Sequence, residues 1–367
     1  MLLTPPEDLP RALAEALAGR QVVAALPPTG QRAALSAFRP ESPVTELKAG
    51  VLVVTSGSTG DPKAVALSST AVLASAAATH TRLGGAGDWV CVLPTHHVAG
   101  MMTVARAVAA GHRVRFAASD LSDLPAAQGR SYLSVVGAQL HRATTDPDLL
   151  SRLRGYAAVL VGGSAISPRL LEQVRRAGVR LVTTYGMAET CGGCVYDGLA
   201  LDGVRVGFAG DRITLSGPMA FSGYRLDPEL TSQVLDGETV LTSDRGRLVD
   251  GRLQVTGRTD DVVISGGANV DLAQAQRISD AVFGPPEAGG PVLLAVEDER
   301  WGHRIVAVTL ATPDLDAVTG RLRERLGAAA LPRELRRVPA LAYTPTGKID
   351  RRALQRAWQE ESDGDGR

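Results

Sequence analysis

Residues 55–63 read Thr-Ser-Gly-Ser-Thr-Gly-Asp-Pro-Lys and directly follow an apolar run at 51–54, Val-Leu-Val-Val. The β-branched run predicts a buried strand, and the glycines and hydroxyls after it predict a tight polar loop. Glycines let a backbone approach a ligand closely, successive loop amides can bind phosphate oxygens, and Lys63 adds a positive charge. The stretch is typical of a loop that binds a nucleotide phosphate; a Ser/Gly-rich surface turn is the alternative.

This loop differs from an ordinary P-loop. In a P-loop, Gly-Lys-Ser/Thr leads directly into a helix, whereas here Pro62 precedes Lys63 and removes one amide donor. We therefore expect a mobile phosphate-binding loop and disfavour a P-loop NTPase.

Composition narrows the class of protein. A chain of 367 residues predicts two or three domains, and 44% apolar with only 4% aromatic residues predicts cores of Val, Leu and Ala. With 39 basic and 39 acidic residues, no net charge recruits nucleic acid or an anionic membrane. The N-terminus lacks the basic start and apolar core of a secretory signal, and no apolar run is long enough to span a membrane. We expect a cytoplasmic protein that acts on small molecules.

Lysines and cysteines are both scarce. Lys48, Lys63 and Lys348 are the only lysines among the 39 basic residues, so a lysine here indicates a position where a flexible point charge works better than a guanidinium. Cys191 and Cys194 form a C-x-x-C with no second pair or nearby His for a zinc site, and Cys91 stands alone. We expect all three cysteines to be reduced and structural.

From residue 51 the pattern alternates between strands and helices. A helix at 9–18 and an uninformative connection come first, and the alternation then predicts strands at 89–93, 113–116, 132–136, 157–161 and 180–184, with helices at 68–82, 98–110 and 168–177. Such alternation predicts a parallel sheet with helices on its faces and a ligand site where the strands end.

Polar residues gather after these strands. His96 and His97 follow the strand at 89–93, Gly162-Gly163-Ser164 follow 157–161, and Tyr185 to Thr190 follow 180–184. A histidine in such a place is more often a structural hydrogen bonder than a catalyst.

Beyond residue 200 the predicted elements change. Short strands and a hairpin around Asp250-Gly251 indicate a small barrel or distorted sheet. Helices from about 272, 315 and 351 and strands at 292–296 and 305–310 then indicate a second, small α+β domain. The arginines between 321 and 337 are mixed with glutamates, which favours a solvated helix face over a nucleic-acid site. The tail 361–367 is expected to be disordered.

Several motifs together resemble the ordered motif set of the adenylate-forming enzymes, which include acyl-CoA synthetases, peptide-synthetase adenylation domains and luciferases. They are TSGSTGDPK at 55–63, YGMAET at 185–190, LTSDRG at 241–246, GRTDDVVISGG at 257–267 and PTGKIDR at 345–351. The resemblance implies an α/β fold: a large N-terminal domain (1–258) of mixed and parallel sheets with flanking helices and a small β-rich subdomain, and a small mobile C-terminal α+β domain (259–367) with its hinge at Asp260.

The resemblance also implies a reaction. A carboxylate attacks the α-phosphate of ATP, pyrophosphate leaves, and the thiol of coenzyme A cleaves the acyl-adenylate. Mg²⁺ would be held by Glu189, Thr190 would bond the α-phosphate, Tyr185 would flank the adenine, and Asp244 and Arg258 would bind the ribose or a phosphate. Implied ATP-binding residues are Thr55, Ser56, Gly57, Ser58, Thr59, Gly60, Lys63, Tyr185, Gly186, Asp244 and Arg258.

The C-terminal domain would contribute the moving parts. Lys348 would bridge the attacking carboxylate and the α-phosphate during adenylation. Rotation about Asp260 would then withdraw Lys348 and bring the Gly266-Gly267 turn to the tunnel through which coenzyme A enters.

LPTHHVAGMM at 93–102 and TYGMAETCGGCVYDG at 184–198 are similar to motifs of the compact 2-succinylbenzoate:CoA ligases of menaquinone synthesis. This implies 2-succinylbenzoate as the acid, with His97 near the acyl pocket, as a catalytic candidate, and Gly163, Ser164 and Thr184 lining it. Alternatives are another acyl- or aryl-CoA ligase, an adenylating enzyme that loads a carrier protein in trans, and a non-catalytic nucleotide-binding relative. A homodimer is an open expectation.

Overall fold

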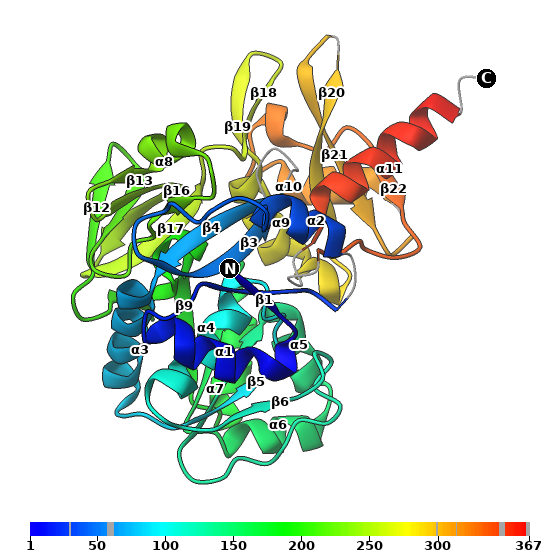
Figure 1. Cartoon of the computed structure of the whole chain (residues 1–367). Coiled ribbons are helices and arrows are strands. Elements are labelled where there is room, and N and C mark those ends of the chain that lie inside the picture. Colours follow the sequence, from blue (N-terminus) through cyan, green and yellow to red (C-terminus); the bar gives the residue numbers. More distant parts are fainter. Residues whose placement is uncertain (29–30, 57–61, 299, 313, 345–348, 365–367) are drawn as a thin grey trace. The chain divides into compact units, whose positions relative to one another are not determined.

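The computed structural model describes residues 1–28, 31–56, 62–298, 300–312, 314–344 and 349–364 (Figure 1). The chain divides into two compact units. The first comprises residues 1–242 and 248–254, and the second comprises residues 243–247 and those from 255 onward. The predicted domain boundary after Arg258, and the hinge at Asp260, stay predictions.

The first sheet carries the strand that leads into the phosphate-loop motif. Its order is β1-β2-β3-β4-β14, with bounds Leu2–Thr4, Val23–Ala25, Ala49–Ser56, Pro62–Ser68 and Gly223–Tyr224. β1, β2 and β3 are parallel, and β4 and β14 are antiparallel to their neighbours. Val51 and Val53 share a core with α1, whereas Leu52 and Val54 share one with α2. Burial of both faces explains the continuous apolar run. The helices are η1 (Pro6–Asp8), α1 (Leu9–Leu17) and α2 (Gln31–Phe38).

The second sheet is the predicted parallel sheet. Its order is β11-β10-β9-β8-β7-β5-β6. The strands from β6 to β9 pair in parallel, and β10 and β11 extend the sheet by antiparallel pairing. The strand bounds are β5 Asp88–Cys91, β6 Val114–Phe116, β7 Ser131–Val136, β8 Ala158–Gly162, β9 Leu181–Met187, β10 Gly192–Tyr196 and β11 Leu199–Ala200.

Helices cover both faces of this second sheet. α3 and α4 contribute to the core on one face, and α5, α6 and α7 contribute to the core on the other. Their bounds are α3 Ser69–Leu83, α4 Val98–Ala109, α5 Gly137–Thr144, α6 Pro147–Arg154 and α7 Pro168–Arg176. The α/β class predicted from the alternating pattern is confirmed.

The third sheet has the order β12-β13-β16-β15, and β17 pairs with β16. The β16-β17 turn has φ of 50° at Asp250 and 74° at Gly251, which is the pair of left-handed residues that an Asp-Gly hairpin needs. The predicted hairpin is confirmed. Bounds are β12 Arg205–Ala209, β13 Arg212–Ser216, α8 Pro228–Val234, β15 Leu235–Asp236, β16 Thr239–Val249 and β17 Arg252–Arg258.

The second unit contains the predicted small α+β fold. Its sheet has the order β19-β18-β21-β20, and β22 pairs with β21. The bounds are β18 Val262–Ser265, β19 Ala268–Asp271, α9 Leu272–Phe283, η3 Pro286–Ala288, β20 Val292–Asp298, β21 Gly302–Thr309, α10 Leu315–Leu322, η4 Ala328–Ala330, β22 Leu335–Arg337 and α11 Arg351–Gly364. Helix α11 extends to Gly364, and Glu361 lies 3.7 Å from Arg336, while the predicted disorder of the tail 361–367 stays a prediction. Residues 365–367 lie outside the described residues.

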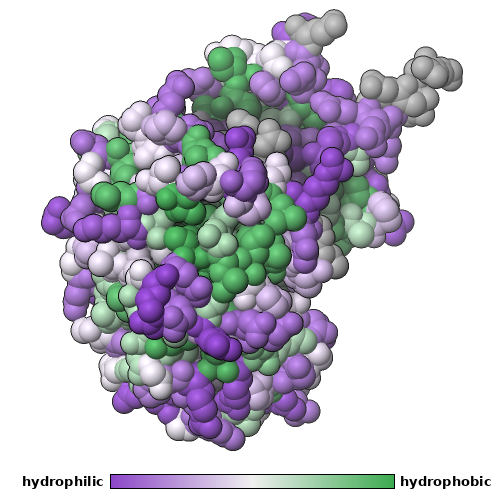
Figure 2. All heavy atoms as spheres, viewed as in Figure 1, coloured by the Kyte–Doolittle hydropathy of each residue, from purple (hydrophilic) through white to green (hydrophobic). Residues whose placement is uncertain are grey.

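Most apolar side chains are inside the two units. Figure 2 shows apolar side chains also gathering on the surface around the N-terminus, where Met1 and Leu2 are exposed. Within the described residues no helix has the length and apolarity needed to cross a membrane. Cys91, Cys191 and Cys194 are buried free thiols, and burial raises the pKa of Cys91 and Cys194 to about 12.

Candidate functional site

The phosphate-loop motif connects the two strands of a β-hairpin. Thr55 pairs with Lys63 and Ser56 pairs with Pro62 across β3 and β4. Lys63 is thus held on a strand, whereas a P-loop lysine is held at the start of a helix. The predicted phosphate ligands inside the loop, Gly57, Ser58, Thr59 and Gly60, lie outside the described residues.

Residues 185–190 form the second predicted segment of the site. They end strand β9 and continue into a 3-10 turn, η2, over Ala188–Thr190. Thr190 is fully buried, and its hydroxyl donates to Gly192 O at 2.8 Å and accepts from the Met187 N–H at 3.0 Å. Thr190 therefore holds the turn that presents Glu189. Its bond to the α-phosphate stays a prediction, as does the adenine contact of Tyr185.

Gly186 has no room for a side chain. A Cβ there would lie 2.1 Å from Gly192 O and 2.8 Å from Gly193 Cα, and both obstacles are backbone of the paired strand β10. We expect Gly186→Ala to destabilise the first unit by about 1–3 kcal/mol, because β9 and β10 must separate. Thermal unfolding measures this.

Gly320→Ala is the matched control for Gly186→Ala. Gly320 lies inside α10, and a methyl group added there would have nothing within 4 Å, so the same substitution should leave stability unchanged or raise it by about 0.4–1 kcal/mol. Similar shifts of Tm in the two variants would contradict the packing argument at Gly186.

Glu189 and Lys63 both lie beside the side chain of Tyr224. The Tyr224 hydroxyl donates to Glu189 Oε1 at 2.7 Å, and Lys63 Nζ lies 5.9 Å from the centre of the Tyr224 ring. Burial, and then the charge of Glu189, raise the pKa of Tyr224 well above its ordinary value, so the phenol keeps its proton. A cation and a hydrogen-bonded carboxylate thus lie beside the hairpin that carries the phosphate-loop motif.

The predicted acyl-pocket residues lie in or after strands of the second sheet. His97 precedes α4, and its Nδ1 lies 2.9 Å from Val54 O in β3. A carbonyl oxygen only accepts, so Nδ1 carries a proton and donates to Val54 O. Its neighbour His96 has a pKa lowered to about 4 by burial and by His97.

The remaining predicted acyl residues lie just after β8 or on β9. Gly163 and Ser164 follow β8 and are exposed, and Gly163 has a left-handed φ of 88°. Thr184 lies on the adjacent parallel strand β9, with its hydroxyl 3.4 Å from Val161 O. β8 and β9 end at the same edge of the sheet, as the sequence predicts, but no acyl contact is tested by this arrangement.

The second unit brings together three residues to which the resemblance assigns separate roles. Arg258 Nη1 donates to Asp244 at 2.9 Å, and its Nε and Nη2 each donate to Asp260 at 2.7 Å. The bond with Asp260, which outweighs the opposing effect of burial, and the charges of Asp244 and Asp260 raise the pKa of Arg258. The predicted nucleotide residues and hinge residue therefore form one ion-pair cluster.

Gly266 and Gly267 form the turn between β18 and β19. Their φ angles are 58° and 80°, and the Gly266 N–H donates to Trp301 O at 2.9 Å. A Cβ at Gly266 would lie 2.5 Å from the Trp301 ring, so this turn requires glycine. Lys348 lies outside the described residues.

Comparison with known proteins identifies the family. The sequence model described as AMP-binding enzyme matches residues 8–238. This chain belongs to the AMP-binding enzyme family. The adenylate-forming resemblance drawn from the motifs is confirmed. Among similar proteins, a probable 2-succinylbenzoate–CoA ligase of Mycobacterium tuberculosis is 36% identical over 370 residues, covering 96% of this chain and 95% of that protein.

Other relatives of this AMP-binding enzyme are named for the same activity. The 2-succinylbenzoate–CoA ligase of Escherichia coli is 30% identical over 314 residues, covering 83% of this chain and 68% of its own length. A structure of an E. coli MenE variant with bound OSB-AMS matches with a TM-score of 0.77 and 25% identity, covering 98% of this chain and 87% of that chain.

A more distant structure shows the same fold. The o-succinylbenzoate coenzyme A synthetase of Bacillus subtilis, solved with ATP and magnesium ion, matches with a TM-score of 0.69 and 22% identity over 85% of this chain and 70% of that chain.

Sequence reasoning missed Tyr224 and the neighbouring ion pair between Arg225 and Glu46. Tyr224 is one of only six tyrosines, but it lies 35 positions from Glu189, and no local spacing connects the two. Arg225 and Glu46 are 179 positions apart.

Proposed function

We propose that this AMP-binding enzyme is a 2-succinylbenzoate:CoA ligase. It would join 2-succinylbenzoate to ATP, releasing pyrophosphate, and then transfer the acyl group to the thiol of coenzyme A, releasing AMP. The observation that carries the proposal is the match with the M. tuberculosis relative, which extends over nearly the full length of both chains. ATP and coenzyme A are cytoplasmic metabolites, and the cytoplasm is where we expect the reaction.

A carboxylate needs such activation because its negative charge repels nucleophiles and its oxide is a poor leaving group. Attack by the carboxylate oxygen on the α-phosphorus forms an anhydride bond as the bond to pyrophosphate breaks. The thiolate then attacks the acyl carbon, and AMP leaves. In this chain Lys63 and the loop amides would hold the β- and γ-phosphates, where positive charge stabilises the departing pyrophosphate.

Glu189 is the residue that fits Mg²⁺. Magnesium prefers oxygen ligands, and usually takes one or two carboxylates together with substrate phosphates and water. Glu189 is half-buried, and Tyr224 bonds its Oε1, while within the described residues no partner is found for Oε2. Among those residues no three His, Cys, Asp or Glu side chains converge as a metal site, so the ion would need the nucleotide as well. When bound, it would neutralise phosphate charge.

The acyl pocket would use the polar groups at the strand ends. A dicarboxylate with an aromatic ring needs an apolar slot and a few hydrogen-bond donors. Ser164 and Thr184 offer hydroxyls, Gly163 leaves space beside them, and His97 is anchored to β3 through its Nδ1.

The second unit would complete each half-reaction. Asp244 would accept from the ribose hydroxyls, and Arg258 would contact the ribose or a phosphate. Both would first loosen the ion-pair cluster that they form with Asp260. Lys348 would serve adenylation, and the Gly266-Gly267 turn would serve the entry of coenzyme A after rotation about Asp260.

ATP–pyrophosphate exchange across a panel of carboxylic acids tests the proposal. We expect 2-succinylbenzoate to support the fastest exchange, and addition of coenzyme A to yield 2-succinylbenzoyl-CoA by mass spectrometry. Exchange with a different aryl or acyl acid but not with 2-succinylbenzoate would overturn the substrate. Exchange without a CoA product would favour loading of a carrier protein in trans, and absence of exchange with every acid would favour a non-catalytic nucleotide-binding protein.

A further inference from the structure

Tyr224 connects the two charged residues that the proposed function assigns to the metal–nucleotide complex. β14 pairs antiparallel with β4, and Tyr224 stands opposite Val65. Lys63 and Val65 point to the same face of β4, so Lys63 is the diagonal neighbour of Tyr224 across the pair. This register explains why Lys63 Nζ lies 5.9 Å from the centre of the ring. This distance lies at the outer limit of a cation–π interaction.

The other end of the ring reaches the segment after β9. The Tyr224 hydroxyl donates to Glu189 Oε1 at 2.7 Å, an ordinary length for an O–H···O hydrogen bond. The backbone of Glu189 is fixed as well, since the Phe221 N–H donates to Glu189 O at 2.9 Å. The Phe221 ring meets the Tyr224 ring edge-on at 5.0 Å. Glu189 is therefore held at both its main chain and one carboxylate oxygen.

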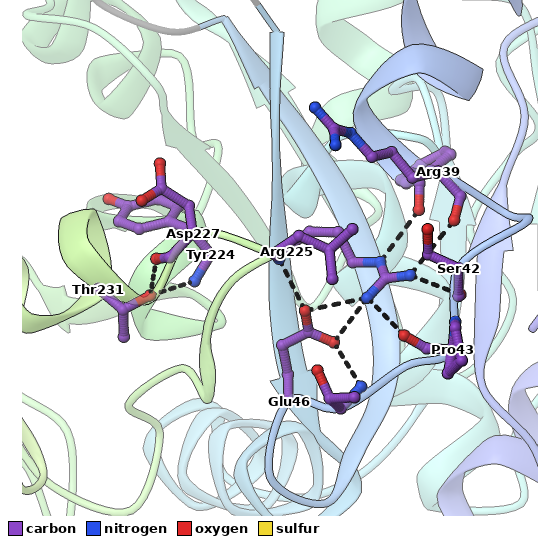
Figure 3. Close-up of polar contacts among 11 residues, drawn as sticks. Arg39, Ser42, Pro43, Glu46, Tyr224, Arg225, Asp227 and Thr231 are labelled. Atoms are coloured by element: carbon purple, nitrogen blue, oxygen red, sulfur yellow. Dashed lines mark hydrogen bonds and ion pairs between the residues drawn. The ribbon is translucent and has the colours of Figure 1, made fainter.

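The backbone of Tyr224 is itself held firmly. Its N–H donates to the Thr231 hydroxyl at 2.9 Å, and that hydroxyl donates to Asp227 O at 2.7 Å (Figure 3). The next residue, Arg225, donates its N–H to Ala64 O at 2.8 Å. The hydroxyl of Tyr224 thus projects from a fixed point on the strand next to Lys63.

We infer that Tyr224 is a positioning residue for the metal–nucleotide complex. By occupying Glu189 Oε1 it fixes the rotamer of the carboxylate and leaves Oε2 for Mg²⁺, and its ring limits the positions that Lys63 can take. The inference rests on the proposed role of Glu189. Partners that orient a metal-binding carboxylate typically contribute 10- to 100-fold to metal affinity.

Tyr224→Phe removes the hydroxyl and keeps the ring. We expect the Mg²⁺ concentration for half-maximal ATP–pyrophosphate exchange to rise about 10-fold, at the lower end of the range for such partners, with a smaller change in kcat at saturating Mg²⁺. A second readout needs no turnover: titration of Mn²⁺ into protein with ATP, followed by electron paramagnetic resonance, should show a similar loss of affinity. Tyr224→Leu should in addition raise the KM for ATP, because Lys63 loses its ring contact.

Tyr156→Phe is the matched control. Tyr156 is buried in the first unit, and its hydroxyl donates to Pro125 O at 2.7 Å, away from the predicted site residues. We expect Tyr156→Phe to lower Tm about as much as Tyr224→Phe does. It should leave unchanged both the Mg²⁺ concentration for half-maximal exchange and the affinity for Mn²⁺. If Tyr224→Phe leaves Mn²⁺ affinity at the wild-type value, the inference is wrong. Because Mn²⁺ binding requires no acid, that result is distinct from a failure of 2-succinylbenzoate to support exchange.

Discussion

Lys348→Ala is expected to lower the rate of adenylation by 10²- to 10³-fold or more while leaving thioester formation largely intact, as judged from the usual effect of removing one group that stabilises transition-state charge. Adenylation brings a carboxylate against an α-phosphate, so two negative groups must approach each other. A compact ammonium between them offsets that repulsion. Thioester formation starts from the acyl-adenylate, whose acyl carbon no longer bears a carboxylate charge, and needs no such bridge. ATP–pyrophosphate exchange measures the first step, and release of AMP from supplied acyl-adenylate with coenzyme A measures the second.

Two further variants sharpen the Lys348 test. Lys348→Arg keeps the charge but replaces a flexible point charge by a planar fork, so we expect it to restore little of the lost adenylation. Lys48→Ala is the control, because Lys48 is exposed and is the only lysine outside the motifs. The rates of both half-reactions should stay within about two-fold of wild type, as expected for a surface substitution. Equal loss of both half-reactions in Lys348→Ala would contradict its restriction to one step.

The fold was predictable where the apolar pattern is long and regular. The strands of the parallel sheet and helices α3, α4 and α7 lie within a few residues of their predicted bounds. Residues 19–50 were not predictable, because the three-residue strand β2 and the eight-residue helix α2 lie among prolines and glycines and are too short to show a clear apolar period. Such short elements are specified by the sheet and core that they join and not by their own sequence.

The candidate site was predictable only for residues that belong to a sequence motif. The sequence places Glu189 after β9 and Lys63 after the loop, and the structure has both there. Their common contact with Tyr224 depends on how β14 pairs with β4, and this pairing joins segments about 160 residues apart. Likewise, the ion-pair cluster of Asp244, Arg258 and Asp260 could not be read from roles assigned to each residue separately.

The ion pair behind Tyr224 should carry a large share of the stability of the first unit. The side chain of Arg225 is fully buried, and that of Glu46 is 7% exposed. The guanidinium donates to both carboxylate oxygens of Glu46 at 3.1 and 3.3 Å. It also donates to four backbone carbonyls, those of Phe38, Arg39, Ser42 and Pro43. Every donor nitrogen of Arg225 is thus used, which ties residues 38–46 to β14.

Arg225→Met is expected to destabilise the protein by about 3–5 kcal/mol, because it leaves a buried carboxylate and four carbonyls without their cation. For a unit of this size that corresponds to a fall in Tm on the order of 10 °C. Glu46→Gln should cost less, since the amide oxygen still accepts from Arg225 and the Leu226 N–H. Thermal unfolding, followed by circular dichroism, measures both variants.

The loss of stability expected for Glu46→Gln should depend on pH. Burial opposes ionisation of Glu46, but bonds from the Leu226 N–H and from Arg225 outweigh it and hold the pKa of Glu46 below its ordinary value. A carboxylate with a lowered pKa stabilises the fold at neutral pH, and this contribution is lost as the pH falls through the lowered pKa. The difference in Tm between wild type and Glu46→Gln should therefore shrink on acidification.

Burial, and not the mere presence of an ion pair, is what makes the Arg225 effect large. Arg176 pairs with Glu172 one helical turn away on α7, and both side chains are mostly exposed. Arg176→Met removes the same charge from the same unit, yet should cost only about 0.3–0.5 kcal/mol, because water already solvates the partners. Equal shifts of Tm for Arg176→Met and Arg225→Met would show that the bonds to Glu46 and to the four carbonyls add nothing beyond a surface pair. A large shift confined to Arg225 would locate the stabilising contact in the segment that holds β14, and with it Tyr224, against the strand that bears Lys63.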